Sequence, residues 1–299
     1  MPRLMRSMKF ICLALLCLST AACGWEPRTD WSLPVWSDDD QSIAVAQQSL
    51  ETKHNVALYG TGGRTRYTGV QIHTAQPEGQ EGFVAVGPML DGQVQSLYHM
   101  RSAGYVLVGH ALTNEGNETQ DRTWIYTRID LNTGQGRELD RRENVPSQLP
   151  CVEGSAFGAD PGIIGVPSPD GGVIAMVVTE PDCASTQSTL RFLDAQSLRQ
   201  MGPTYDLERE ANLREPSQLA VAWTTQGTFL VRSNGFFFGG PATAYSPDAA
   251  PVALDNVGPD CFFPPTTSAQ INAAGDYVEV NSSGQYRVTP GQNPGFGCQ

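Results

Sequence analysis

The sequence has few of the features that identify most enzymes and nucleic-acid-binding proteins. Only 17% of its 299 residues are charged, and it contains four histidines. Its longest apolar run, Phe10–Leu18, is nine residues, whereas a membrane-spanning helix needs ~20. No histidine lies in an H-E-x-x-H zinc motif, and Gly60-Thr61-Gly62-Gly63 lacks the Lys-Ser/Thr of a phosphate-binding loop. We therefore expect no metal, no cofactor and no catalytic residue that sequence alone can name.

Basic residues are scarce. Lys and Arg number 19 against 31 Asp and Glu, for a net charge of −12. Three of the basic residues and none of the acidic ones lie in residues 1–22, so the net charge of the remainder is −15. A chain this acidic repels phosphate backbones, which argues against a nucleic-acid partner. The run Asp38-Asp39-Asp40 is expected to be a solvated acidic segment.

The first 23 residues follow the order of a secretory signal. Basic residues come first, then the apolar run Phe10–Leu18, then Ser-Thr-Ala-Ala before Cys23. Because Ala21, Ala22 and Cys23 match its lipid-attachment pattern, the segment resembles a bacterial lipoprotein precursor. Thr20 departs from that pattern, in which leucine is usual, so ordinary cleavage by signal peptidase stays open as the alternative.

The resemblance to a lipoprotein implies a cellular location for the protein and a division of the chain into segments. Cys23 would carry the lipid and anchor the protein in the bacterial cell envelope, at the outer membrane because Gly24 is not Asp; a soluble periplasmic or secreted protein is the alternative. Residues 1–22 are then the signal peptide, 23–50 a lipidated N-terminus and tether, and 51–299 the folded domain. Within the tether, Ile43–Leu50 is expected to form a short helix.

From Asn55 onward the sequence predicts an all-β fold. Gly and Pro are frequent, at 31 and 21 residues, and short segments alternate apolar and polar side chains as half-buried strands do. Sixteen strands are expected. They are 56–59, 66–73, 82–86, 94–99, 105–111, 123–131, 162–166, 173–179, 189–194, 219–224, 228–233, 236–238, 251–254, 269–272, 277–281 and 285–289.

A weak internal repeat favours a β-propeller. The stretch Val166–Val177, VPSPDGGVIAMV, resembles the S-P-D-G turn of TolB-type and WD40-like propeller repeats, and Ser246-Pro247-Asp248 echoes its first half. In those families the turn links two strands of one blade. At ~40–50 residues per blade, the chain predicts about five or six irregular blades. One or two β-sandwiches are the alternative.

The cysteines fit an oxidising compartment. Apart from Cys23 and two cysteines within the signal, four remain: Cys151, Cys183, Cys261 and Cys298. An even set in an exported protein suggests two disulfides. Of the three possible connectivities we favour Cys151–Cys183 and Cys261–Cys298, because each pair closes a local loop. No C-x-x-C spacing supports a zinc site instead.

The most apolar local feature is Phe236, Phe237 and Phe238, between glycines on both sides. Neighbouring strand residues point to opposite faces, so both faces of this segment are apolar. The segment could be an inner strand covered on both sides, or an exposed aromatic patch for an envelope protein partner.

Two functions from different classes follow. The first is a membrane-anchored lipoprotein with a non-enzymatic binding or scaffolding role through its propeller-like domain. The second is an extracytoplasmic hydrolase acting on glycan or peptide through a spatially assembled site. Carboxylates or a Ser/His pair meeting in a concave pocket would favour the hydrolase.

Overall fold

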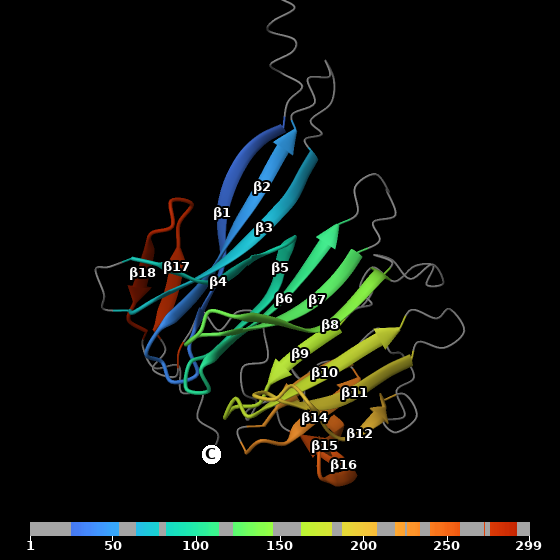
Figure 1. Ribbon diagram of the computed structural model, residues 1–299. Helices are drawn as coiled ribbons and strands as arrows, with labels where there is room; N and C mark the ends of the chain where they lie inside the picture. Colours follow the sequence, from blue (N-terminus) through green and yellow to red (C-terminus); the bar gives the residue numbers. More distant parts are fainter. Residues whose placement is uncertain are drawn as a thin grey trace, which may run out of the picture.

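The computed structural model describes residues 25–53, 64–77, 82–113, 122–145, 163–180, 187–207, 219–224, 226–233, 240–257, 272 and 276–291. Within them every regular element is a β-strand (Figure 1). The strands are β1 (Trp25–Trp36), β2 (Ile43–Lys53), β3 (Arg64–Ala75), β4 (Val84–Leu90), β5 (Gln93–Met100), β6 (Tyr105–Thr113), β7 (Arg122–Asp130), β8 (Gly136–Val145), β9 (Ile163–Pro167), β10 (Val173–Glu180), β11 (Gln187–Asp194), β12 (Gln200–Asp206), β13 (Leu219–Trp223), β14 (Phe229–Ser233), β15 (Gly240–Ser246), β16 (Ala249–Val257), β17 (Tyr277–Val280) and β18 (Tyr286–Thr289).

Consecutive strands pair into separate antiparallel sheets. Four sheets have four strands each, in the orders β1-β2-β3-β4, β5-β6-β7-β8, β12-β11-β10-β9 and β13-β14-β15-β16, and β17-β18 form a two-stranded fifth sheet. A four-stranded meander of this kind is the blade of a β-propeller, whereas a sandwich joins its strands by Greek-key connections. The prediction of an all-β, propeller-like fold is confirmed, with five sheets among the described residues.

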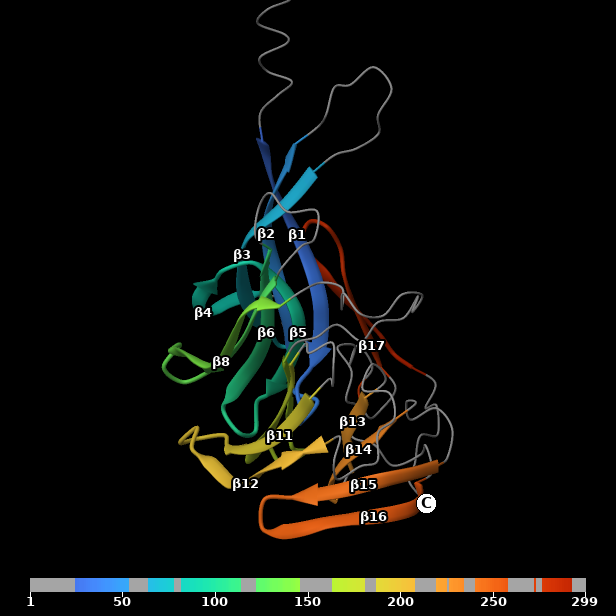
Figure 2. The same ribbon diagram turned by 90° about the vertical axis from the view of Figure 1, so that its right-hand side faces the viewer.

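Buried side chains join each sheet to the next. One cluster joins the first two sheets and includes Val70 and Val106. A larger cluster runs through the second, third and fourth sheets and includes Phe192. A third joins Trp36 and Ile43 of the first sheet to β17, which lies beside β1 (Figure 2). The sheets therefore pack face to face in chain order, and the terminal hairpin returns to the first sheet.

The segment expected to be a tether is, from β1 onward, part of the first sheet. β1 pairs with β2 along almost its whole length, and β2 pairs with β3 on its other side. The prediction of a short helix at Ile43–Leu50 was wrong. Its residues Ile43–Ala46 are fully buried in a central strand, and that burial outweighs the good helix propensity of alanine.

The S-P-D-G turn links two strands of one sheet, as its resemblance implied. Ser168 Oγ donates to Asp170 Oδ1 (2.6 Å) and accepts from the Val173 amide (2.9 Å), and Gly171 has φ 68°. Buried β10 follows at once. A left-handed residue here requires glycine or a tolerant polar residue, which explains the glycine.

The same turn recurs between β1 and β2 with no glycine. Ser37 Oγ donates to Asp39 Oδ1 (2.6 Å) and accepts from the Ser42 amide (3.0 Å), while Asp40 takes the left-handed conformation with φ 55°. Aspartate tolerates this conformation better than most side chains. The repeat is therefore structural, with serine and aspartate as its constant members.

The predicted lipid site and the predicted disulfides lie outside the described residues, as do Phe236, Phe237 and Phe238. The cysteines concerned, all outside the described residues, are Cys23, Cys151, Cys183, Cys261 and Cys298. The lipid site and both disulfides therefore stay predictions. Over the described ranges, no helix has the length and apolarity needed to cross a membrane.

Candidate functional site

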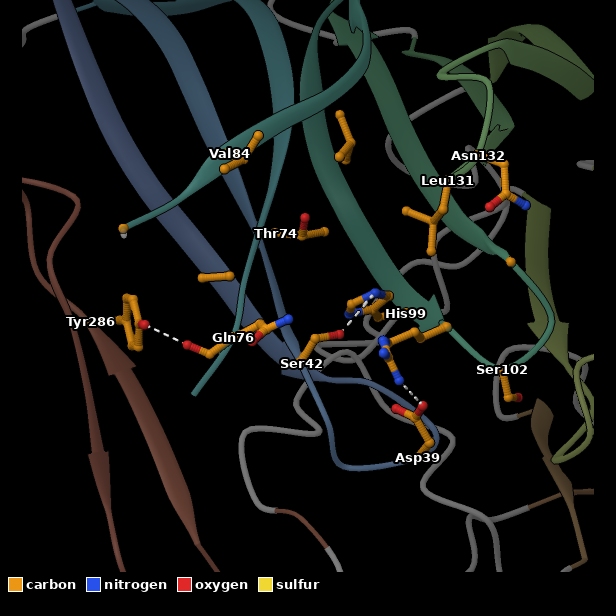
Figure 3. A pocket seen from close by; sticks show the side chains of 15 residues that line it. Asp39, Ser42, Thr74, Gln76, Val84, His99, Ser102, Leu131, Asn132 and Tyr286 are labelled. Atoms are coloured by element: carbon orange, nitrogen blue, oxygen red, sulfur yellow. Dashed lines mark hydrogen bonds and ion pairs between the residues drawn. The ribbon is translucent and has the colours of Figure 1, made fainter. Parts of the chain in front are cut away.

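A cavity of about 1030 Å³ forms an open cleft where three sheets meet (Figure 3). The end of β3 and the start of β4 supply Thr74, Gln76 and Val84. The end of β5 and the turns of the second sheet supply further lining, including Asn132. Tyr286 of the terminal hairpin closes the remaining side. The cleft therefore requires the hairpin to be seated on the first sheet.

Tyr286 is fixed in place by its hydroxyl and by its ring. The hydroxyl donates to the carbonyl oxygen of Gln76 (2.6 Å), and the ring lies 5.0 Å from the ring of Phe83. Phe83 in turn stacks on Trp31 of β1, at 5.6 Å and 22°. These three half-buried rings hold the hairpin against the first sheet.

The acidic run at 38–40 fastens the first sheet to the second instead of being freely solvated. Asp38 accepts from the amide and the hydroxyl of Ser102, and Asp39 is ion-paired with Arg101. Burial opposes ionisation of Asp39, but hydrogen bonds from Ser37 and Arg101 outweigh it and hold the pKa of Asp39 below its usual value. These contacts in the cleft wall therefore hold the first and second sheets together.

A serine and a histidine meet beside the cleft. Ser42 Oγ lies 3.4 Å from His99 Nε2, and the two residues are only 6% and 4% exposed. Burial lowers the pKa of His99 to about 4, and the nearby Asp39 carboxylate offsets this only in part. His99 Nδ1 has no hydrogen-bond partner among the described residues. The pair has the residue types of a nucleophile and its base.

Several features of this pair are unsuitable for nucleophilic catalysis. A general base works best with a pKa near the operating pH, and His99 is a much weaker base than that. The Asp39 carboxylate is held by Ser37 and Arg101, so it does not orient the imidazole. The Ser42 amide is bonded to Ser37 Oγ and cannot help form an oxyanion hole.

The other described histidines have structural partners. His110 Nδ1 lies 2.7 Å from the carbonyl oxygen of Asp91, and its Nε2 lies 3.0 Å from Thr127 Oγ1. His73 Nε2 lies 3.2 Å from Gln47 Oε1. Within the described ranges, no group of three or more His, Cys, Asp or Glu side chains is placed to hold a metal ion.

A second cavity, of about 620 Å³, lies between β1 and the terminal hairpin. It is lined by Trp31 and Tyr277, by Asn281 and Gln285 of the hairpin turn, and again by Tyr286. A Cβ at Gly284 would lie 2.5 Å from the Trp31 ring, so this turn rests directly on the indole. Tyr286 is common to both cavities.

The residues that line the two cavities were not singled out as sites by sequence reasoning. Ser42 and His99 are 57 positions apart, and Gln76 and Tyr286 are 210 apart. No local motif connects such residues. The one local signal is the concentration of tryptophans at Trp25, Trp31 and Trp36, of which Trp31 stacks on Phe83 and Trp36 packs in the cluster that includes Val278 of β17.

No protein-family model and no curated protein sequence matches the chain. Two solved structures are similar in shape at low identity. The acylaminoacyl peptidase of Pyrococcus horikoshii is 11% identical with a TM-score of 0.42, and the match covers 77% of this chain and 33% of the peptidase chain. A structure of HIRA residues 644–1017 is 10% identical with a TM-score of 0.36, covering 78% of this chain and 55% of that one. The chain thus spans about a third of the length of the peptidase and about half of the length of the HIRA structure.

Proposed function

We propose that this protein is exported and anchored in the bacterial cell envelope by a lipid on Cys23, and that its propeller-like domain binds a ligand in the cleft. The binding role is supported by the fact that polar side chains in the cleft are held in fixed positions. Asp39, Arg101 and Tyr286 are fixed by partners within the fold, and the cleft remains open between them. Such a preformed cavity with a few positioned polar groups is typical of a binding site.

The anchor rests on the resemblance of the first 24 residues to a lipoprotein precursor. β1 begins at Trp25, two residues after Cys23. A lipid on Cys23 would therefore hold the first sheet close to the membrane, with little spacer between them.

The anchor is tested on mature protein purified from the bacterium that makes it. Mass spectrometry of the N-terminal peptide should find a diacylglycerol group on Cys23, and Cys23→Ala should move the protein to the soluble fraction. An unmodified N-terminus at Cys23 would refute the anchor.

The binding role is tested with a pair of matched variants. Val84 of β4 lines the cleft and is 60% exposed, whereas Val252 of β16 is 55% exposed and lies in the fourth sheet. Retention of the labelled mature protein on membrane-free envelope material should fall with Val84→Trp and be unchanged with Val252→Trp. Equal retention of both variants would contradict a role for the cleft.

Hydrolysis is the second candidate, and the proximity of Ser42 to His99 is the observation that favours it. A fluorophosphonate probe labels serines activated by a base. We expect no labelling of the wild-type protein, since His99 is a weak base whose Nδ1 meets no carboxylate among the described residues. Labelling that disappears in Ser42→Ala would establish the hydrolase and replace the binding proposal.

A further inference from the structure

The charge of the two cavities differs from that of the whole chain. The sequence carries a net charge of −12, yet the charged residues lining the cavities balance. Asp39 and Arg101 form an ion pair in the larger cavity. Glu279 and Arg287 stand directly opposite each other on β17 and β18 in the smaller one. A charged ligand would meet no uncompensated opposite charge in either cavity.

Besides these charged pairs, the lining combines neutral polar side chains with aliphatic ones such as Val84 and Leu131, and with the Tyr286 ring that both cavities share. Hydroxyl and amide side chains dominate the polar part, with Thr74 and Asn132 in the larger cavity and Asn281 and Gln285 in the smaller. These groups both donate and accept hydrogen bonds. Lipid chains would instead require a continuous apolar lining.

The shared aromatic residue gives the cavities a common wall. The Tyr286 ring lies 5.0 Å from the ring of Phe83, and its hydroxyl donates to the Gln76 carbonyl, so the orientation of the ring is set before a ligand arrives. In Figure 3 the ring stands across the cleft from Asn132, with Thr74 between them. A rigid ring facing neutral donors and acceptors fits a ligand with an apolar face and a polar edge.

We propose that the two cavities are adjoining subsites for an uncharged oligosaccharide, with Tyr286 as the stacking platform between them. A sugar ring has C–H groups on its faces and hydroxyls at its edge, which matches a lining that offers the Tyr286 ring, aliphatic side chains and neutral hydrogen-bonding groups. The volumes, about 1030 and 620 Å³, are of the size of known ligand pockets, ~300–1000 Å³. This inference rests on the proposed binding function and names its ligand class.

An extended peptide is the main rival ligand. It would pair with the free edge of β4, where Val84 and Val86 line the larger cavity. That mode would use neither Tyr286 nor the second cavity. The oligosaccharide accounts for both cavities and is therefore preferred.

The first test is binding of the labelled mature protein to an array of defined ligands. The array carries neutral oligomers of hexoses, neutral oligomers of N-acetylated amino sugars, acidic oligosaccharides and unmodified peptides. Binding to neutral oligosaccharides is expected, and the two neutral groups distinguish a cell-wall type of glycan from a surface polysaccharide. Binding to acidic sugars or peptides alone, or to nothing on the array, would overturn the proposal.

The second test is calorimetric titration of variants with the neutral oligosaccharide that binds best. Tyr286→Leu keeps an apolar side chain against Phe83 but removes the platform, and should weaken binding about tenfold, with Tyr286→Phe close to wild type. Gln285→Ala should weaken binding, whereas Gln200→Ala, an exposed glutamine of β12, should not. Unchanged affinity in Tyr286→Leu would overturn the platform.

The two proposals fail in different ways. If Val84→Trp reduces envelope retention but no neutral oligosaccharide binds, the cleft is a binding site for another ligand class. If Val84→Trp and Val252→Trp behave alike in the retention assay, the cleft itself is not the site, and the oligosaccharide proposal falls with it.

Discussion

Two aromatic clusters in this protein have similar ring spacing but opposite exposure. In the buried seam between the third and fourth sheets, Phe192, Trp223 and Phe229 lie 5.1–5.9 Å apart and are at most 2% exposed. In the open seam between the first sheet and the terminal hairpin, Trp31, Phe83 and Tyr286 are spaced 5.0–5.6 Å but only half-buried. Rings at similar spacing therefore stabilise the fold in one place and border two cavities in the other.

The buried seam is also locked by polar contacts. Trp223 Nε1 donates to the carbonyl oxygen of Val166 (3.0 Å), and the Tyr205 hydroxyl donates to that of Ser246 (2.7 Å). In the open seam, the corresponding link among the described residues is the hydrogen bond from the Tyr286 hydroxyl to the carbonyl oxygen of Gln76. We infer that the buried seam supports stability and that the open seam is available for binding.

The largest expected effect is a loss of stability in the buried seam. Phe192→Ala should lower the free energy of unfolding by about 3–5 kcal/mol, because it leaves a cavity among rings that cannot collapse. Phe83→Ala, the same change in the open seam, should cost only about 1–2 kcal/mol. Urea denaturation gives both values. An equal loss of unfolding free energy in the two variants would contradict the distinction between the buried and the open seam.

The next effect concerns the pH dependence of stability. Burial lowers the pKa of His99 from its ordinary value of 6.5 to about 4 in the folded protein, so below pH 6.5 the unfolded chain takes up a proton that the folded one does not. Stability should therefore rise between pH 4 and 6.5, with His99 contributing up to about 3 kcal/mol.

The His99 effect is measured by urea denaturation of wild type and His99→Gln across that range. The variant should show a shallower rise with pH. Some rise will persist in it, because burial also lowers the pKa of His73 and of His110. Identical slopes would show that His99 is protonated equally in both states.

A smaller effect is expected at the repeated turn. Ser168→Ala and Ser37→Ala each remove one hydroxyl that donates to an aspartate and accepts from an amide. Each change should cost about 1–2 kcal/mol, because it leaves a half-buried or buried backbone amide, that of Val173 or of Ser42, without its acceptor. Thermal unfolding compares the two. A cost in only one of them would show that the two turns are not equivalent.

The smallest effect on stability is expected from the variants that probe the cleft. Val84→Trp and Val252→Trp both add a ring at an exposed position of an outer strand. Each should change stability by no more than about 0.5 kcal/mol. A large loss of stability in Val84→Trp would mean that the open seam tolerates no extra volume. The retention assay would then need a smaller substitution than tryptophan, such as Val84→Arg.

The sequence pattern predicted strands well where their side chains are largely buried, on one face or, as in β10, on both. β3, β10 and β11 were found at nearly their true bounds. β8 and β12 were missed, since Gly136–Val145 is dominated by charged residues and Gln200–Asp206 contains Gly and Pro. These are outer strands, which have less to bury and so carry a weaker pattern.

The first sheet and the cleft could not be predicted for different reasons. β1 is exposed along its first half and includes two prolines, so its sequence has the character of a tether. The repeated turn was hidden because Asp40 replaces the expected glycine at the left-handed position. The cleft depends on the hairpin returning to β1, which is a long-range contact with no local sequence signal.

Hydrogen exchange with and without the best-binding neutral oligosaccharide tests the central claim most directly. We predict that exchange slows together in residues 74–76, 99–102 and 285–287, which come from the three parts of the cleft wall, and is unchanged in 190–193 and 229–231 of the buried seam. Protection confined to the buried seam, or to only one of the three cleft segments, would contradict the account.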